Sequence, residues 1–334
     1  MIRLSARFSS PRLGFSSPRL ASVVALIALS LPVLQATAQP DAPTAPAPAA
    51  APAFPNPDPA NFTAAAPTKE AVNAFLEASW GYDSSRFWQV QAILKTPVEG
   101  VSKVVILVSD KDGKEKPAAV QFFVLPGGKF LLAQDEIIPF GEHPYAENRA
   151  LVRQRADGPY RGSALKELEI VEFADFQCPH CKEAQANMEK LAVDFPKARI
   201  VFQNYPLARI HPQSVMAASY GVCVNKLGGS NAFFQYASAV FEGQEGLATA
   251  DGATLTVNSA VTKAGLDPVK VATCVATPAT AAAVEASVKL AQDLNINQTP
   301  MLVINGRQVP IGGTPYETIK QIVEYQIKLD GVAQ

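Results

Sequence analysis

The 334-residue chain is predicted to end in an α/β domain with a helical insertion, which follows a small α+β domain. Three patterns predict the α/β domain. A near-continuous apolar run over 168–176 is typical of a strand buried on both faces. Apolar residues then recur at the helical period between Ala184 and Phe195. Because a second apolar run follows over 198–205, the order indicates a β-α-β unit.

The rest of this domain is predicted from helical and hairpin signals. Residues 211–294 are Ala-rich with a helical pattern, and they form the expected insertion. Asn305-Gly306 between two short apolar runs is a strong two-residue hairpin signal. A final amphipathic helix completes the order β-α-β, helical insertion, β-β-α. The domain is expected to occupy residues 162–334.

The preceding α+β domain is expected over residues 69–161. Its first helix has Val72, Phe75 and Leu76 on one face, at the spacing i, i+3, i+4. Strands separated by turn residues follow, over residues 87–94, 101–108, 120–124 and 130–133. The charged stretch 148–163 suits a linker. The domain contains no catalytic constellation, so it is a candidate oligomerisation or substrate-binding domain.

The N-terminal segment predicts export. Arginines within the first nineteen residues precede an apolar stretch over 21–34, and Ala36-Thr37-Ala38 forms a small-residue cleavage site. Residues 1–38 are therefore expected to be a signal peptide. A membrane anchor is the alternative, but the apolar stretch is short and contains Pro32. Residues 39–68 are rich in Ala and Pro, which is typical of a semi-rigid linker.

The cysteine spacing indicates a redox pair. Of the four cysteines, Cys178 and Cys181 stand where the first strand meets its helix. A helix start offers unpaired N–H groups and the positive end of the dipole, and both stabilise a thiolate. Cys178 is therefore the expected nucleophile and Cys181 its more buried resolving partner. Pro179 suits a first helical position, and His180 can act as a donor or cation near Cys178.

Other interpretations of this motif are weaker. A zinc site usually needs two further close-spaced ligands, and Cys223 and Cys274 form no second pair of that kind. Haem attachment needs His directly after the second cysteine, where this chain has Lys182. An inert disulfide at a strand end stays open. The strand before the motif and the helix after it favour redox chemistry, for which no metal and no cofactor is expected.

Residues 165–329 resemble the thioredoxin superfamily, and within it the DsbA-like branch. Cys178-Pro179-His180-Cys181 is identical to the active-site tetrapeptide typical of DsbA, and the helical insertion also matches this branch. The resemblance implies a thioredoxin-like fold, redox activity and protein substrates. Export and the bacterial character of the resemblance together imply a periplasmic location, with full secretion left open.

The resemblance also implies roles for three further residues. Glu172 lies six residues before Cys178, at the position of the family's buried acid, where it could relay a proton for Cys181. Thr299-Pro300 is similar to the family's cis-proline segment, which pairs with substrate backbone. A solvated Glu172, a trans Pro300 and a merely exposed His180 are the alternatives. His143 and His211 are expected to have local structural or surface roles.

Cys223 and Cys274 both lie in the helical insertion, 51 residues apart. A structural disulfide is the expected state. A second redox pair and two separate buried thiols are the alternatives that the sequence leaves open.

Three functions follow from these patterns. The first is a dithiol oxidase of exported proteins. The second is an isomerase or reductase that acts as a homodimer, because the DsbC and DsbG isomerases dimerise through an added N-terminal domain. The third is a client-binding module with a non-catalytic redox pair. The expected partners are protein thiols and disulfides and an unidentified redox partner. A net charge of -1 argues against nucleic acid, and no membrane span is expected after signal cleavage.

Overall fold

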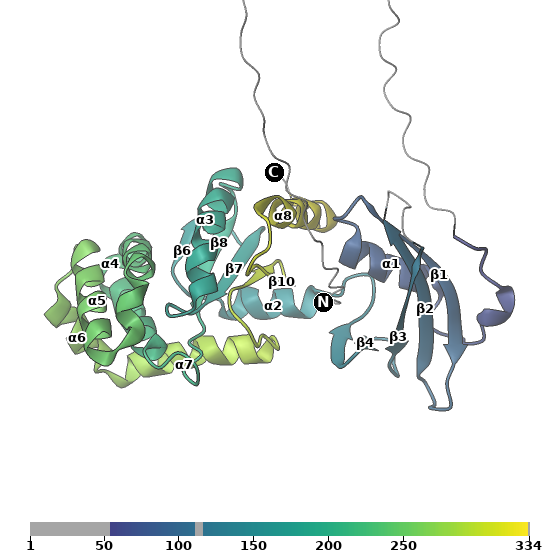
Figure 1. Ribbon diagram of the computed structural model, residues 1–334, viewed down its shortest axis with the longest axis horizontal. Helices are drawn as coiled ribbons and strands as arrows, with labels where there is room; N and C mark the ends of the chain where they lie inside the picture. The colour runs from purple at the N-terminus through teal and green to yellow at the C-terminus, as the bar shows by residue number, and fades with distance from the viewer. Residues whose placement is uncertain (1–53, 111–115, 333–334) are drawn as a thin grey trace, which may run out of the picture. The chain divides into compact units, whose positions relative to one another are not determined.

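The computed structural model describes residues 54–110 and 116–332. The predicted fold class is confirmed, since a small α+β domain precedes a thioredoxin-like α/β domain with a helical insertion (Figure 1). The predicted signal peptide and the first part of the predicted linker lie outside the described residues.

The N-terminal domain consists of one helix and an antiparallel sheet whose strands follow one another in chain order. Thr68 caps the helix by accepting a hydrogen bond from the Ala71 N–H (3.1 Å). The ring of Phe75 lies 6.2 Å from that of Phe122, which ties the helix to the sheet. The elements are α1 (Lys69–Trp80), β1 (Arg86–Lys95), β2 (Ser102–Asp110), β3 (Ala118–Val124), β4 (Phe130–Ala133) and β5 (Glu136–Pro139).

The prediction that residues 39–68 form a linker is wrong for residues 54–68, the part that the structure describes. The main-chain N–H groups of Thr63 and Ala64 both donate to the Ile93 carbonyl of β1 (3.0 Å each). The Ser102 hydroxyl of β2 donates to the carbonyl of Ala66. Backbone hydrogen bonds to an edge strand require no apolar side chains, so an Ala/Pro-rich composition does not reveal them.

The second sheet has the strand order β10-β9-β7-β8-β6. β7 and β8 are parallel, and the other neighbours are antiparallel. The predicted β-α-β unit corresponds to β7, α3 and β8, and the predicted Asn305-Gly306 hairpin joins β9 to β10. The strands are β6 (Tyr160–Gly162), β7 (Glu169–Ala174), β8 (Arg199–Asn204), β9 (Met301–Ile304) and β10 (Arg307–Pro310).

The expected linker at 148–163 is also wrong, and so is the domain boundary at 161–162. This stretch lies within the helix α2 (Ala146–Arg155) and the strand β6, which pairs with β8. Val152 and Ala156 are fully buried against Val171 and Val201 of the second sheet. One apolar residue per turn suffices to dock this helix, whereas its charged residues dominate the composition.

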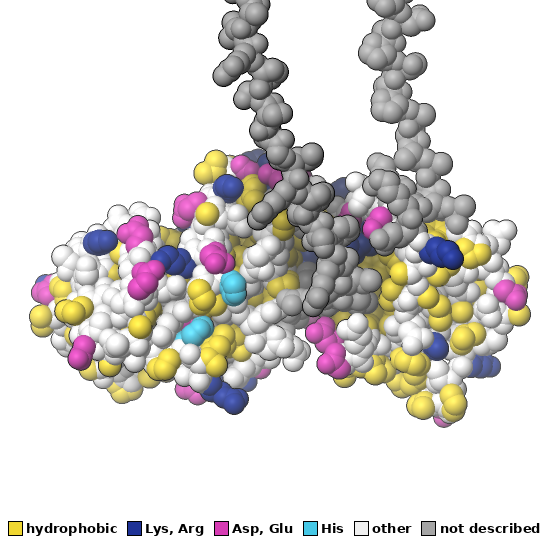
Figure 2. All heavy atoms as spheres, in the orientation of Figure 1, with side chains coloured by type: hydrophobic (Ala, Val, Ile, Leu, Met, Phe, Trp, Pro, Cys, Tyr) yellow, Lys and Arg dark blue, Asp and Glu magenta, His cyan; other side chains and the backbone are white. Residues whose placement is uncertain are grey.

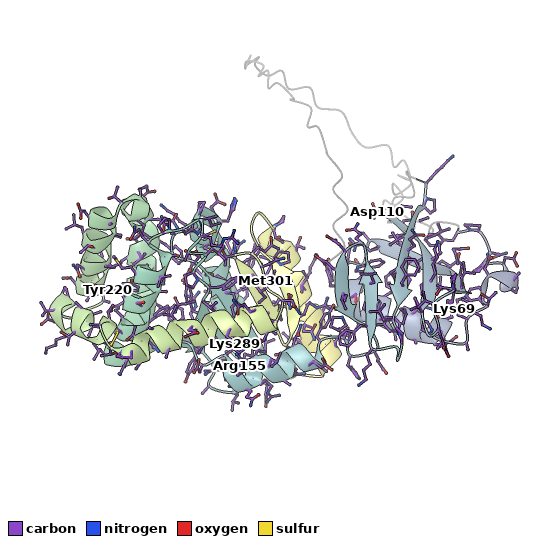
Figure 3. All side chains as sticks on the ribbon, turned by 90° about the horizontal axis from the view of Figure 1, so that it is seen from below. Lys69, Asp110, Arg155, Tyr220, Lys289 and Met301 are labelled. Atoms are coloured by element: carbon purple, nitrogen blue, oxygen red, sulfur yellow. A yellow bond between two sulfur atoms is a disulfide. The ribbon has the colours of Figure 1, made fainter. Side chains whose placement is uncertain are left out.

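Helices cover both faces of this sheet (Figure 1). α3 (Pro179–Asp194) and α8 (Tyr316–Asp330) pack with Ile170 on one face. α2 and α7 (Pro278–Asp293) pack with Val171 on the other. Figure 3 shows α2 and α7 side by side, and Arg155 of α2 forms an ion pair with Asp293 of α7 (2.6 Å). Since strand residues alternate between faces, Glu172 shares the α3 face with Ile170.

The helical insertion has its own core. It contains α4 (Ser214–Glu242), the 3-10 helix η2 (Gln244–Ala248), α5 (Ala250–Lys263) and α6 (Pro268–Val275). Phe176, which directly follows β7, enters this core and lies 5.7 Å from Tyr236 and 5.2 Å from Phe241, measured between ring centroids. The redox motif therefore begins where the sheet meets the insertion.

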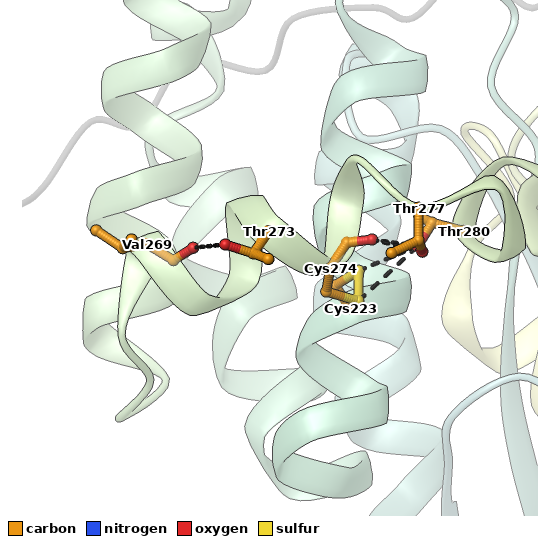
Figure 4. The surroundings of a disulfide bond; sticks show 6 residues. All are labelled: Cys223, Val269, Thr273, Cys274, Thr277 and Thr280. Atoms are coloured by element: carbon orange, nitrogen blue, oxygen red, sulfur yellow. Dashed lines mark hydrogen bonds between the residues drawn. A yellow bond between two sulfur atoms is a disulfide. The ribbon is translucent and has the colours of Figure 1, made fainter.

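A disulfide joins Cys223 of α4 to Cys274 of α6 (Figure 4). Cys223 is fully buried, and the Thr280 hydroxyl at the start of α7 lies 3.3 Å from its sulfur. Thr280 also donates to the carbonyl of Cys274 (2.9 Å). The disulfide and the Thr280 hydroxyl together connect α4, α6 and α7.

Acidic and basic side chains are interspersed on the face drawn in Figure 2. Within residues 54–110 and 116–332, no single helix is long and apolar enough to cross a membrane. The pair α6 and α7 passes that test together but is bent by 72°.

Replacing Cys223 and Cys274 together by Ser is expected to lower the free energy of unfolding by about 4 kcal/mol, from the chain entropy of the closed loop. Urea unfolding of the oxidised and the double-mutant proteins measures this loss. The reduction potential of Cys178 and Cys181 is expected to stay unchanged. A loss of disulfide exchange without a loss of stability would instead indicate a second redox pair.

Candidate active site

The Cys178-Pro179-His180-Cys181 motif lies at the N-terminus of α3. Cys178 is the N-cap residue, with an extended backbone (φ −76°, ψ 121°), and Pro179 takes the first helical position. The Cys178 N–H donates to the Asp175 carbonyl (3.1 Å). The Cys178 carbonyl accepts from the N–H of Cys181 (3.1 Å). These bonds fix the first sulfur above the start of the helix.

The two thiols of the motif have opposite acidities. Both are free, with Cys178 5% exposed and Cys181 fully buried. A hydrogen bond from the Cys181 thiol is the largest influence on Cys178. Despite the opposing effect of burial, this bond, Thr299 and the N–H groups of Cys181 and His180 lower the pKa of Cys178 from 9.0 to about 5. Burial first, and then the neighbouring Cys178, raise the pKa of Cys181.

The Thr299–Pro300 segment faces the motif. Its peptide bond is cis, and the Cys178 sulfur lies 3.8 Å from the Thr299 carbonyl oxygen. The Thr299 hydroxyl is buried and has no hydrogen-bond partner among the described residues, and Thr299 is one of the residues that lower the pKa of Cys178. The structure thus brings Thr299 and Pro300 to the cysteines, 121 residues away in sequence.

His180 acts on Cys178 through its backbone more than through its ring. The ring is exposed, and its Nδ1 lies 3.0 Å from the carboxylate of Glu183, one turn further along α3. Hydrogen bonding and charge from Glu183 raise the pKa of His180, and the charge of Cys178 contributes less. The ring is therefore paired with Glu183, while hydrogen bonding from the His180 N–H is among the causes that lower the pKa of Cys178.

Glu172 is buried below the motif, as its place in β7 predicts, with 3% of its surface exposed. Burial raises the pKa of this carboxyl to about 7, although a hydrogen bond from Gln185 and the charge of Arg161 oppose the shift. The Gln185 amide donates both to the Glu172 carboxylate (2.9 Å) and to the Cys181 carbonyl (3.1 Å). Glu172 is thus linked to the second cysteine through one side chain.

Asp175 is a site residue that sequence reasoning missed. Its carboxylate is buried and accepts hydrogen bonds from the N–H groups of Gln177 and Leu207 (2.7 Å each). His211 Nδ1 lies 2.8 Å from the same carboxylate. The Asp175 N–H also donates to the Cys181 sulfur (3.4 Å). An acid within the apolar run before Cys178 was the available signal, whereas nothing in the sequence linked it to His211.

The remaining predicted residues lie away from this site. Cys223 and Cys274 form their own disulfide and reach neither redox cysteine. Within the part of the chain that the structure describes, no group of His, Cys, Asp and Glu side chains could hold a metal ion.

A family model described as thioredoxin matches residues 155–325, just over half of the chain. The chain belongs to the thioredoxin family. The match covers the second sheet, the insertion and most of α8, and it begins before the boundary expected from the sequence. The predicted resemblance to the thioredoxin superfamily is thereby confirmed.

Other similarities cover parts of the chain. The Na(+)/H(+) antiporter NhaA 3 of Salinispora tropica is 33% identical over 91 residues, which are 27% of this chain and 14% of the antiporter. The chain therefore spans about a seventh of that relative's length. A thioredoxin-like oxidoreductase from Silicibacter pomeroyi is 24% identical, over 54% of this chain and 98% of its own, with a TM-score of 0.46. Proteus mirabilis ScsC is 23% identical over 55% of this chain and 77% of its own, also with a TM-score of 0.46.

Family membership and the cysteine pair at a helix N-terminus define the class of chemistry. A thioredoxin domain with two free thiols in a CxxC motif exchanges disulfides with other thiols. The family and the free thiol pair therefore suit the thiol–disulfide exchange that the sequence predicts.

Glu172→Gln is expected to increase stability above pH 7. The folded pKa of Glu172 is raised from 4.5 to about 7, so its contribution is fully present below pH 4.5 and is lost as the pH rises through 7. The variant should therefore be more stable than the wild type by about 3 kcal/mol at pH 8. Urea unfolding from pH 4 to pH 9 measures the difference. The exposed Glu285→Gln is the control, and parallel pH profiles for all three proteins would contradict a buried, neutral Glu172.

Proposed function

We propose that this thioredoxin-family protein is an exported dithiol oxidase that introduces disulfides into protein substrates through Cys178 and Cys181. The opposite acidities of the two thiols carry this proposal. Lowering the pKa of Cys178 from 9.0 to about 5 favours its thiolate by roughly 5 kcal/mol. Since a stabilised thiolate stabilises the reduced pair, the disulfide form becomes a stronger oxidant.

The proposed reaction transfers two electrons from substrate to enzyme. A substrate thiolate attacks the Cys178 sulfur of the enzyme disulfide, the bond between Cys178 and Cys181 breaks, and Cys181 leaves with the electron pair. A second substrate thiolate then attacks the substrate sulfur of the mixed disulfide. The substrate disulfide forms, Cys178 leaves as a stable thiolate, and the enzyme is reduced. A redox partner that accepts two electrons must then reoxidise the pair.

Cys181 needs a proton when it leaves, because burial disfavours its thiolate. Glu172 is the proposed donor. Its pKa of about 7 keeps a large share of it protonated at neutral pH, and Gln185 holds the carboxyl beside the backbone carbonyl of Cys181. In the reverse direction the same carboxylate would accept the proton, so one group serves both directions.

The Thr299–Pro300 segment is the proposed substrate-binding element. It lies beside the nucleophile, within 3.8 Å of its sulfur, and an extended chain can pair its backbone with a substrate segment. Pro179, a further candidate substrate-binding residue, fits the first helical position because this position needs no N–H donor within the helix. Cys223 and Cys274 are proposed to be structural, since their disulfide is buried in the insertion.

An isomerase or reductase is the second candidate, favoured by the N-terminal domain. That domain has its own helix and sheet, as an oligomerisation or substrate-binding domain would, and homodimer formation stays a prediction. Export to the periplasm is supported by the sequence pattern of residues 1–38, which lie outside the described residues.

Equilibration of the Cys178–Cys181 pair with glutathione tests the direction of the reaction. The oxidase proposal predicts a reduction potential well above the value of about −270 mV typical of thioredoxin. Cys178→Ser should abolish oxidation of a reduced, unfolded client protein. A potential close to that of thioredoxin would favour the reductase or isomerase instead. If the wild type exchanges no disulfides, and Cys178→Ser binds the client as well as the wild type does, the result would favour a binding module.

A further inference from the structure

The helical insertion contacts the redox motif through one side chain of η2. The amide Nε2 of Gln244 donates to the carbonyl of Phe176 (2.8 Å) and to the carbonyl of Cys178 (3.0 Å). These two carbonyls lie on either side of Gln177, in the loop between β7 and α3. One amide from the insertion therefore bridges the backbone that carries the nucleophile.

The same loop contacts the insertion in the opposite direction. The Gln177 amide donates to the carbonyl of Leu247 at the end of η2 (3.0 Å), and its oxygen accepts from the N–H of Gln213 (2.8 Å). One turn into α3, Lys182 pairs with Glu245 of η2 (2.8 Å). Segment 244–247 thus meets both the loop and the first turn of the active-site helix.

The positions of the Phe176 and Cys178 carbonyls affect which N–H groups can donate to the Cys178 sulfur. The Cys178 carbonyl accepts the first helical hydrogen bonds, from Cys181 and Lys182 (3.1 and 3.3 Å), so its direction sets how Cys178 joins the helix. Hydrogen bonding from the N–H groups of His180 and Cys181, which helps to lower the pKa of Cys178, depends on the geometry of this junction. Without the Gln244 amide, the Phe176 and Cys178 carbonyls lose a hydrogen-bond donor, and the backbone can rotate so that they pair with other donors.

We propose that Gln244 is a positioning residue of the redox centre, which holds the Phe176 and Cys178 carbonyls so that the N–H groups of α3 stay directed at the nucleophilic sulfur. The proposal rests on the proposed redox role of Cys178. The insertion is then a working part of the redox centre, because η2 adjusts the balance between the dithiol and the disulfide.

A positioning role and a structural role differ in a measurable way. If Gln244 only supported the fold, its loss would destabilise the reduced and oxidised proteins equally. If it supports the thiolate, its loss destabilises the reduced protein more, because only that form carries the negative sulfur. By the thermodynamic cycle, the difference between the losses of unfolding free energy in the two redox forms gives the change in the free energy of reduction, and so the change in reduction potential.

The test compares Gln244→Met, which keeps the size of the side chain but cannot donate, with the wild type. The equilibrium constant for reduction by glutathione is expected to fall about tenfold, which is about 30 mV for a two-electron couple. The pKa of Cys178 should rise in parallel. Gln235→Met is the matched control, since Gln235 lies exposed on α4 of the same insertion, and it should leave the equilibrium unchanged.

Equal destabilisation of both redox forms, with an unchanged glutathione equilibrium, would overturn the proposal. If Gln244→Met does not fold, Gln244→Leu provides the same comparison, since it also lacks a donor and adds no charge. A tenfold or greater fall supports the role, and a wild-type equilibrium constant in that variant overturns it. Each shift is measured against the wild-type protein, so it is distinct from a failure of the oxidase proposal, which concerns the wild-type potential itself.

Discussion

The hydrogen bonds that converge on the Cys178 sulfur are the interaction on which the rest of the site depends. They come from the Cys181 thiol, Thr299 and the first N–H groups of α3. The Cys181 thiol and the N–H groups belong to α3, and Thr299 belongs to the segment before β9, so two parts of the fold must be held together. β7 is buried on both faces of the sheet, and Pro179 takes the first position of α3. The Thr299 segment follows the insertion in sequence and lies beside the start of α3. The nucleophile is therefore a product of the whole domain and not of the tetrapeptide alone.

Burial provides the second constraint, because it acts on the two cysteines in opposite ways. At Cys178 the donors outweigh the cost of burial, whereas at Cys181 burial dominates and keeps the thiol neutral. The same buried layer holds Glu172, where burial raises the pKa of the carboxyl to about 7, as the proposed proton donor requires. In the reduced pair, Cys178 thus carries the charge while Cys181 keeps its proton. This asymmetry gives the exchange a preferred direction of attack, at Cys178.

Much of the catalytic domain could be predicted because its signals are local. The apolar run of β7, the period of α3 and the spacing of Cys178 and Cys181 lie within about thirty residues, and alternation in β7 placed Glu172 on the α3 face. Asp175–His211 and Gln244–Cys178 were missed because the partners are 36 and 66 residues apart. No sequence pattern distinguishes a glutamine that binds backbone carbonyls, such as Gln244, from one that lies on the surface of a helix. Composition misled at residues 54–68 and 148–163, where backbone pairing and a single buried apolar stripe determined the structure.

The central claim is that Cys178 is a stabilised thiolate at neutral pH. The most direct measurement is the rate of alkylation of the reduced protein by iodoacetamide between pH 3 and pH 10, with the modified cysteine identified by mass spectrometry. The account predicts modification at Cys178 with a midpoint close to pH 5, and negligible reaction at Cys181. A midpoint between pH 8 and pH 9, as for a free cysteine, or modification of both cysteines at similar rates, would contradict it.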